Sequence, residues 1–351
     1  MPSETDAQER AWMAFPPERS SLGNTAEDTH EARVSWAEVA HAVSGFEPVT
    51  MVVDPADLTA AGKYLSADIE LVTAPLDDAW MRDIGPTFVK DDADGLLGGV
   101  DWVFNGWGQQ DWASWGKDAG IGAAVVRHSG AELVDSPLVN EGGGIQVDGL
   151  GTVLVTETVQ LDPYRNPGLS KADVEAELAS TIGATQVIWL PRGLTRDNKE
   201  FGTRGHVDIV AAIPSPGVLL VHSQRDDAHP DFQVTREIIS LLAGTRDAQG
   251  RSWEIVEVPA PEVLRDAHDW VDYSYINHLV VNGGVIACSF GDRADEGARQ
   301  ILEQAYPGRQ VVTVDARPIF ARGGGIHCIT QQQPAADAPK PGRAREGFSR
   351  P

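Results

Sequence analysis

The sequence predicts an α/β protein, and three observations support that class. Short apolar runs typical of strands alternate along the chain with segments that carry apolar residues at helical spacing. Hydrophobic residues make up 42% of the 351 residues, enough for a substantial core. No Ser/Gly-rich linker or low-complexity segment interrupts residues 8–333. We therefore expect one domain over residues 1–333.

The predicted strands are short runs in which Val, Ile and Leu dominate. They cover residues 47–53, 151–157, 185–190, 217–222, 278–290 and 309–314.

The predicted helices lie at residues 35–46, 170–183, 231–244 and 295–308. Ser170, with Asp173 three residues later, has the pattern of a capping box, and Asp295 precedes a helical run. Glycines stand where C-terminal caps are expected, at positions 183, 244 and 308.

The C-terminal segment 334–351 is rich in proline and charge and offers few side chains to bury. We expect this tail to be disordered.

Two cysteines are too few for a disulfide framework, and we find neither a secretory signal pattern nor an apolar run long enough to span a membrane. A cytoplasmic protein is expected.

The net charge is −24, from 52 acidic and 28 basic residues. This balance argues against nucleic-acid or anionic-membrane binding, because both need a basic face. It is compatible with a cationic substrate. Acidity that serves only solubility is the alternative.

A short Gly- or Asp-marked element followed by apolar residues recurs five times along the chain. It occurs at residues 82–89, 141–147, 204–210, 282–288 and 323–329, with starts 59, 63, 78 and 41 residues apart. Each copy could be a turn that feeds a strand whose start faces a common centre. Chance similarity among strand starts is the alternative.

The two cysteines differ in their surroundings. Cys288 lies in the apolar run GGVIACSF and is predicted to be a buried core thiol. Cys328 lies in GGGIHCITQQQP, where glycines allow backbone to approach a ligand and polar residues follow. This setting suits a nucleophile, which must form a thiolate, although a loop cysteine without function remains the alternative.

A cysteine nucleophile needs a general acid/base, usually histidine. His206 stands out among the nine histidines because Asp208 follows two residues later in RGHVDIV. If this segment is a strand, both side chains point to the same face. A surface pair is the alternative. A metal site is not expected, because the chain has neither HExxH nor CxxC.

The segment DDAWMRDIGPTFV provides a further carboxylate and an aromatic plane. Asp83 precedes a Gly-Pro turn, and Trp80 lies three residues before it. Carboxylates and an aromatic face together suit a planar guanidinium cation. Asp83, His206, Asp208 and Cys328 are thus interpreted as a cation clamp, a proton shuttle and a nucleophile.

These segments, in order, resemble the agmatine deiminase family, part of the wider group of guanidino-modifying enzymes that includes bacterial peptidylarginine deiminase. The resemblance rests on DDAWMRDIGPTFV, VDWVFNGWG, NEGGGIQVDG, IWLPRGL, GHVD, NGGVI and GGGIHCITQQQP, and extends over residues 9–334. It implies a five-bladed α/β propeller, or pentein, of ββαβ units around a central site. The five elements are what such a fold would leave in the sequence.

The resemblance also implies the roles of individual residues. Cys328 would be the nucleophile and His206 the general acid/base, while Asp83 and Asp208 would clamp the guanidinium. Trp80, Glu141 and Arg204 would be further substrate contacts. The reaction would hydrolyse the guanidino group of agmatine, through a covalent amidino-cysteine intermediate, to N-carbamoylputrescine and ammonia. It would need neither cofactor nor metal.

The family pattern and this sequence diverge just before GHVD. Many members carry an acid and then Thr-Asn, whereas this chain has Gly202 and Arg204 within a longer loop. Glu200 or Asp197 could replace the acid that receives the distal ammonium. Alternatively, Arg204 could receive a carboxylate, which would favour arginine or another guanidino acid. Peptidyl-arginine is a further alternative.

Two further function classes are retained. An amidinotransferase would share the Cys/His/Asp chemistry but pass the amidino group to an amine. A non-catalytic binding protein for guanidino metabolites would leave the reactive residues unused. The expected partner is a small cationic guanidino compound, and the oligomeric state, homo-oligomers included, is left open.

Overall fold

The computed structural model describes the chain except for residues 19, 92–94, 199–201, 263–264, 267–269 and 337–351. Of the expected C-terminal tail, Pro334 ends a strand and pairs with Gln8, and the part from residue 337 onward lies outside the described residues. Glu200, considered above as an acid for the distal ammonium, also lies outside them.

Within the described residues, the strands form five small sheets, and four of these follow one plan. Two antiparallel strands are followed by a third strand that runs parallel to the second. The four sheets comprise β4 (Thr87–Lys90), β5 (Leu97–Val103) and β6 (Glu132–Val139); β7 (Gln146–Val147), β8 (Thr152–Thr156) and β9 (Gln186–Leu190); β10 (Ala211–Ser215), β11 (Val218–Ser223) and β12 (Glu254–Pro259); and β13 (Leu279–Val281), β14 (Gly284–Ser289) and β15 (Gln310–Asp315).

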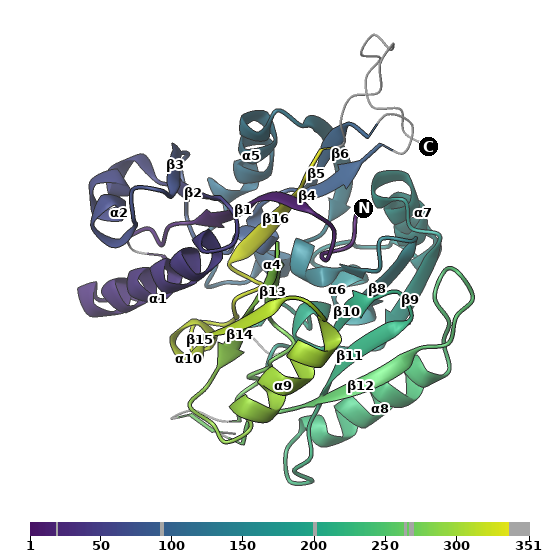
Figure 1. The fold of residues 1–351 in the computed structure, drawn as a ribbon. Helices are drawn as coiled ribbons and strands as arrows, with labels where there is room; N and C mark the ends of the chain where they lie inside the picture. Colours follow the sequence, from purple (N-terminus) through teal and green to yellow (C-terminus); the bar gives the residue numbers. More distant parts are fainter. Residues whose placement is uncertain (19, 92–94, 199–201, 263–264, 267–269, 337–351) are drawn as a thin grey trace.

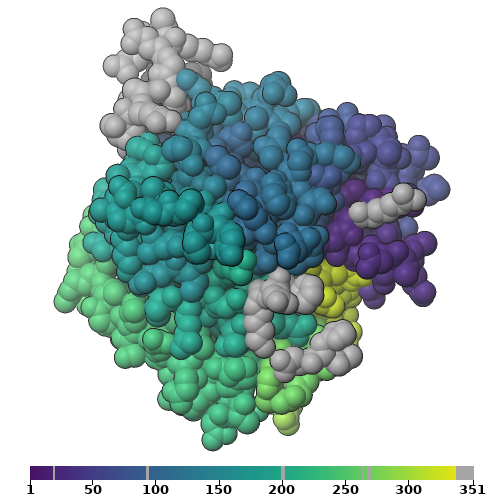
Figure 2. All heavy atoms as spheres, turned by 180° about the vertical axis from the view of Figure 1, so that it is seen from behind, coloured from purple at the N-terminus to yellow at the C-terminus, as the bar shows by residue number. Residues whose placement is uncertain are grey.

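The remaining sheet is completed by both ends of the chain. Its order is β16-β1-β2-β3, with β16 antiparallel to β1 and the other pairs parallel. Figure 1 shows β16 beside β1, and Figure 2 shows the yellow C-terminal part in contact with the purple N-terminal part. The strands are β1 (Gln8–Ala14), β2 (Val49–Val53), β3 (Glu70–Thr73) and β16 (Thr330–Pro334).

Each parallel crossover carries at least one helix, as the geometry of parallel pairing requires. Helices α1, α5, α7 and α8 lie toward the periphery of the molecule (Figure 1). The α-helices are α1 (Ala26–Ser44), α2 (Leu58–Tyr64), α3 (Met81–Ile84), α4 (Gly106–Gln109), α5 (Ile121–Ser129), α6 (Glu157–Gln160), α7 (Lys171–Ile182), α8 (Asp231–Ala243), α9 (Asp295–Ala305) and α10 (Arg317–Phe320). Short 3₁₀ turns are η1 (Pro55–Asp57), η2 (Asp118–Gly120), η3 (Gly142–Gly144) and η4 (Val207–Ile209).

The predicted strands and helices recur with limited shifts. The capping box of Ser170 and Asp173 begins α7, and Gly183 ends it with φ +74°. Helix α1 begins at residue 26 rather than 35, after a capping box of Thr25 and Asp28. Its first turns are charged and mostly exposed, so they carry little apolar periodicity to reveal them.

Two predictions of local structure are wrong. The run 278–290 is a hairpin of two strands, β13 and β14, joined at Asn282 and Gly283, because Gly283 takes the positive φ that such a turn needs. The recurring element predicted at 282–288 therefore coincides with this hairpin turn. The other four elements each lead into a strand, and the corresponding position in this part of the chain lies just before β13. The second error concerns His206 and Asp208, which lie at and within the 3₁₀ turn η4 rather than in a strand.

Two groups of buried hydrophobic residues form the core. The larger group includes Trp12, Trp36, Tyr275 and Phe290, and the smaller one packs α7 against β8. Within the described chain, no helix combines the length and the apolar character that crossing a bilayer requires.

Candidate active site

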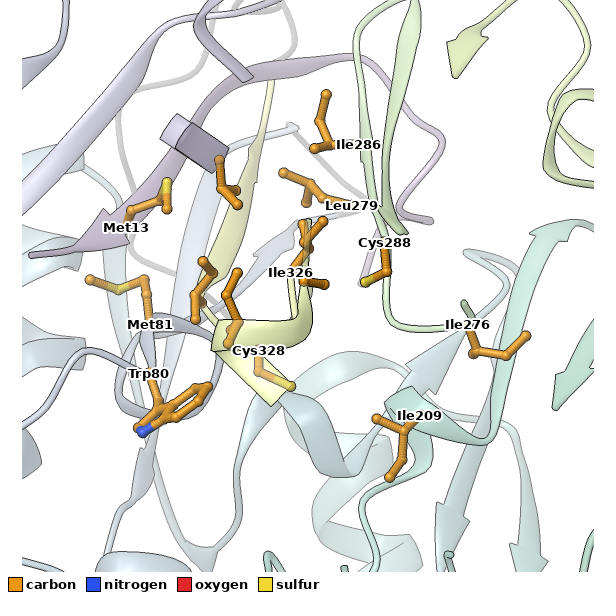
Figure 3. Close-up of a cluster of buried hydrophobic side chains, with 14 of the residues drawn as sticks. Met13, Trp80, Met81, Ile209, Ile276, Leu279, Ile286, Cys288, Ile326 and Cys328 are labelled. Atoms are coloured by element: carbon orange, nitrogen blue, oxygen red, sulfur yellow. The ribbon is translucent and has the colours of Figure 1, made fainter. Parts of the chain in front are cut away.

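Cys328 lies in the loop between α10 and β16, where the chain packs closely against Trp80. A Cβ placed on Gly324 would lie 3.0 Å from Cys328 Sγ and 2.7 Å from a ring carbon of Trp80. Glycine at this position is therefore required sterically. Figure 3 shows Trp80 beside Cys328 at the edge of the main core cluster, while Cys288 lies apart on β14. Cys328 thus adjoins the core, although its sequence surroundings are polar.

The Cys328 thiol is surrounded by polar groups despite its burial. Its Sγ lies 3.4 Å from Asp208 Oδ2 and accepts a hydrogen bond from Asn277 Nδ2 at 3.2 Å. Burial and the negative charges of Asp208 and Asp83 raise its pKa well above the usual value. The thiol is therefore protonated at neutral pH while no cation is bound. Cys288 donates to the carbonyl of Asn277, and burial raises its pKa to about 12, as expected of a core thiol.

His206 is enclosed by carboxylates. Its Nε2 lies 3.1 Å from Glu141 Oε2, and its Nδ1 lies 3.9 Å from Asp83 Oδ1. Burial disfavours the imidazolium, but the charges of Asp83, Glu141 and Asp208 outweigh it and raise the pKa to about 9. At neutral pH this side chain can therefore donate a proton.

Asp208 is held in place through one of its two oxygens. Its Oδ2 accepts a hydrogen bond from His327 Nδ1 at 2.9 Å. Burial alone would raise the pKa of Asp208, but the hydrogen bond and the charge of His327 outweigh burial and lower this pKa. Its Oδ1 is buried and has no hydrogen-bond partner among the described residues. An unpaired buried carboxylate oxygen next to a thiol is costly unless a donor arrives with the substrate.

Asp83 is positioned by two donors from different elements. Trp107 Nε1 donates to its Oδ2 at 2.9 Å, and the backbone N–H of Gly143 donates to its Oδ1 at 3.2 Å. A Cβ at Gly143 would lie 2.5 Å from His206 Nδ1, so glycine is needed at this position too. Burial raises the pKa of Asp83 to about 6, against the attraction of His206.

A second layer of buried ion pairs supports the reacting residues. Arg165 Nε binds both oxygens of Glu141, at 3.0 and 3.1 Å. His327 Nε2 lies 2.9 Å from Glu4 Oε1, so one imidazole bridges Glu4 and Asp208. Burial and the charge of Arg82 lower the pKa of His327, but the interactions with Glu4 and Asp208 outweigh both and raise this pKa.

The structure brings together Trp80, Asp83, His206, Asp208 and Cys328. It does not bring Arg204 to them: that side chain lies 3.7 Å from Asp162 and over the ring of Tyr164. Glu141 is fully buried, and its carboxylate is occupied by Arg165 and His206.

Sequence reasoning missed several residues of the site. Trp107 lies in VDWVFNGWG and His327 lies next to Cys328, but the sequence alone assigns a role to neither. Asn277 and Glu4 have no local motif that could reveal them. Asn277 precedes β13, at the strand start that was misplaced, so recognising the hairpin would have pointed to it.

A cavity opens beside these residues and encloses a space of about 250 Å³, its opening to solvent included. Its lining residues include the reacting side chains, two further carboxylates and two apolar side chains, namely Cys328, His206, Asp208, Asp197, Asp272, Ile209 and Phe320. Among the described residues, no group of three or more His, Cys, Asp or Glu side chains is arranged to hold a metal ion.

The chain matches the model of the Porphyromonas-type peptidyl-arginine deiminase family over residues 1–334. It is 56% identical over 335 residues to a Streptomyces coelicolor protein provisionally assigned as an agmatine deiminase, a match that covers 95% of this chain and 98% of that one. It is 38% identical over 360 residues to the agmatine deiminase of Pseudomonas putida, with 95% of each chain covered.

A solved structure of Enterococcus faecalis agmatine deiminase is similar to this fold, with a TM-score of 0.88, 31% identity and 95% of each chain covered. These matches confirm the resemblance that the sequence motifs carry. The chain therefore belongs to the Porphyromonas-type peptidyl-arginine deiminase family.

Proposed function

We propose that this protein is an agmatine deiminase, which hydrolyses the guanidino group of agmatine to N-carbamoylputrescine and ammonia. The observation that carries the proposal is the buried Cys328 thiol 3.4 Å from Asp208, with the second oxygen of that carboxylate unpaired. A guanidinium supplies the positive charge and the N–H donors that this arrangement lacks. The similarity to agmatine deiminases supports the choice of substrate.

The guanidinium would bind between Asp208 and Asp83, with the ring of Trp80 beside it. Its positive charge offsets the two carboxylates that keep Cys328 protonated. The thiol then ionises as the substrate binds, and its proton leaves to solvent. The carboxylates in turn keep the substrate cationic and its central carbon electrophilic.

The first half-reaction forms a covalent intermediate. The Cys328 thiolate attacks the guanidinium carbon, and the C–S bond forms as the carbon becomes tetrahedral. The imidazolium of His206 then gives its proton to one nitrogen, and the C–N bond breaks to release ammonia. The product of this step is an amidino group on sulfur and a neutral His206.

The second half-reaction hydrolyses that intermediate. Neutral His206 takes a proton from water, which attacks the same carbon. Collapse of the second tetrahedral adduct breaks the C–S bond, releases the ureido product and frees the cysteine. The pairing of His206 with Glu141 keeps the imidazole oriented through both steps. In this mechanism neither a cofactor nor a metal is required.

The distal end of the substrate decides between agmatine and arginine. Arg204, the cation considered for binding a carboxylate, has Asp162 as its neighbour and does not line the described cavity. Asp197, the acid considered for binding the ammonium, accepts hydrogen bonds from Thr203 and from the backbone of His206. The acidic cavity supports a cationic distal group.

The five sheets fit a pentein, and we infer that they are the five blades of a propeller. The pairing of β16 with β1 supports this arrangement, because it lets the last strand complete the sheet that begins with the first. We also infer that residues 1–333 are a single catalytic domain. The cytoplasmic location, the disordered tail and a homo-oligomeric state stay predictions.

The test is ammonia release from agmatine, arginine, 4-guanidinobutyrate and a peptidyl-arginine, with Cys328→Ala as the blank. We expect agmatine to be the preferred substrate and the blank to release no ammonia. Preference for arginine or 4-guanidinobutyrate would overturn the choice of substrate. Transfer of labelled amidino group to an added amine would indicate an amidinotransferase, and turnover unaffected in Cys328→Ser would contradict the mechanism.

A further inference from the structure

The cavity beside Cys328 has a second charged group that the proposed reaction leaves unused. Asp272 lines the same cavity as Cys328, His206 and Asp208. It lies on the segment before β13, five residues ahead of Asn277, which donates to the thiol. One stretch of chain therefore contributes both to the thiol site and to another part of the cavity wall.

The aromatic ring of Phe320 lies close both to the glycine loop and to the segment that carries Asp272. A Cβ on Gly325 would lie 2.6 Å from Phe320, so this ring packs directly against the loop that carries Cys328. The ring of Phe320 also lies 5.2 Å from that of Tyr273, the residue next to Asp272. The apolar side chains of Phe320 and Ile209 line the cavity together with Asp272. Such a wall suits a methylene chain that leads from the guanidinium to a charged end.

The carboxylate of Asp272 is available to a ligand. Among the described residues, only its own backbone N–H donates to it. The neighbouring Arg196 donates instead to the carbonyl of Trp270 and to Asp266. Burial raises the pKa of Asp272 to about 7, and the nearby Asp197 and Asp231 add to this increase against the attraction of Arg196. A partly buried carboxylate in such surroundings gains from the arrival of a cation.

We propose that Asp272 binds the distal ammonium of the substrate and so selects an aminoalkyl guanidine over a guanidino carboxylic acid. This inference rests on the proposed hydrolysis at Cys328. No described residue of the cavity lining apart from His206 carries a positive charge, so a distal carboxylate would meet Asp272 and Asp197 without a counter-ion.

The experiment compares full-length wild type, Asp272→Asn and Asp272→Ala on three substrates that differ only at the distal end. Agmatine ends in an ammonium, butylguanidine in a methyl group and 4-guanidinobutyrate in a carboxylate. The matched control is Glu254→Gln, which removes one carboxylate from an exposed position on β12 outside the cavity.

For Asp272→Asn with agmatine, we expect KM to rise by about 10- to 100-fold with kcat little changed, because a hydrogen bond to a charged group is lost. Butylguanidine should keep its kcat/KM, and 4-guanidinobutyrate should gain. In wild type, KM for agmatine should rise as pH falls through about 7, where Asp272 becomes protonated, while KM for butylguanidine should lack this change.

Equal losses on agmatine and butylguanidine would overturn the proposal, because they would indicate a structural role. An unchanged KM for agmatine in both variants would overturn it as well. Either result leaves guanidino hydrolysis intact. By contrast, wild type that releases ammonia from none of the three compounds would contradict the proposed function itself.

Discussion

At the active site, individual side chains set the charge state of their neighbours. His206 is an imidazolium below pH about 9, and Asp83 is a carboxylate above pH about 6. Neighbouring carboxylates outweigh burial to raise the pKa of His206, whereas burial is the main cause of the raised pKa of Asp83, and Glu141 and Asp208 add to it. Burial and the charges of Asp208 and Asp83 likewise keep the free thiol of Cys328 protonated.

The pH dependence of kcat/KM follows from these groups. As pH falls through about 6, Asp83 is protonated and loses its attraction for the guanidinium; as pH rises through about 9, His206 loses the proton it must donate. Because binding also releases the thiol proton, kcat/KM for this enzyme should rise with pH up to about 9, where the loss of the His206 proton cancels the further gain in thiolate and the profile levels off. Butylguanidine is the suitable substrate, because it has no distal charge. A rate that keeps rising above pH 9 would contradict the assignment.

Trp107 is expected to contribute through its hydrogen bond to Asp83. Trp107→Phe keeps the aromatic bulk but removes the 2.9 Å donor, and we expect kcat/KM to fall by about 10- to 100-fold, the range for a hydrogen bond to a charged group. Trp102→Phe is a matched control, because that indole donates to Thr87 in the smaller core cluster. If both variants lose activity equally, the specific role of Trp107 is wrong.

At the scale of elements, the glycine loops decide which side chains can meet. Gly324 and Gly143 stand where any side chain would collide with the thiol, with Trp80 or with His206. Their surrounding motifs are short and distinctive, which explains why the sequence was informative about the reacting end of the site.

Gly324→Ala tests the loop directly. Its methyl group would push Cys328 or Trp80 out of position, and we expect kcat/KM to fall by about 100-fold, since displacements near 1 Å have effects of that size. Gly297→Ala in helix α9 is the control, because a Cβ there meets nothing within 4 Å. Circular dichroism should show both variants folded. Full activity in Gly324→Ala would show that the close packing is not required.

Local sequence patterns could predict the elements but not the contacts between them. Most strands and helices follow from apolar periodicity and capping, and the errors occurred where local signals were weak. A continuous apolar run hides the hairpin at Asn282, and the residues of the 3₁₀ turn at His206 have the sequence pattern of a strand. Asn277 reaches the thiol only because β13 begins nearby in space, 51 residues from Cys328 in sequence.

At the scale of the whole molecule, the two ends of the chain meet in one sheet, and this brings the N-terminus to the active site. Because β1 pairs with β16, Glu4 lies against His327, 323 residues away in sequence. The contact is buried, and the charge of His327 outweighs burial to lower the pKa of Glu4 to about 2. No local pattern could have predicted it.

Glu4→Gln should therefore affect both activity and stability. Without this anion His327 loses charge, the pKa of Asp208 rises, and the acid limb of kcat/KM should move to higher pH. Breaking a buried pair costs roughly 3–5 kcal/mol of stability at pH 7. Because the folded-state pKa of Glu4 is lowered, its contribution is present above pH about 4.5 and is lost as pH falls toward about 2.

Thermal unfolding at pH 7 and at pH 4 measures the stability effect, with Glu9→Gln as the control from the exposed side of the same segment. The difference between Glu4→Gln and wild type should shrink at the lower pH. An equal difference at both values would show that the charge of Glu4 is not responsible.

The central claim is that Cys328 carries the amidino group during turnover. The most direct measurement is mass spectrometry of the protein quenched with acid during turnover of agmatine, followed by peptide mapping. We expect an adduct with the mass of agmatine less ammonia on the peptide that contains Cys328, absent in Cys328→Ser and absent from Cys288. Full ammonia release in Cys328→Ser, or an adduct on Cys288 alone, would contradict it.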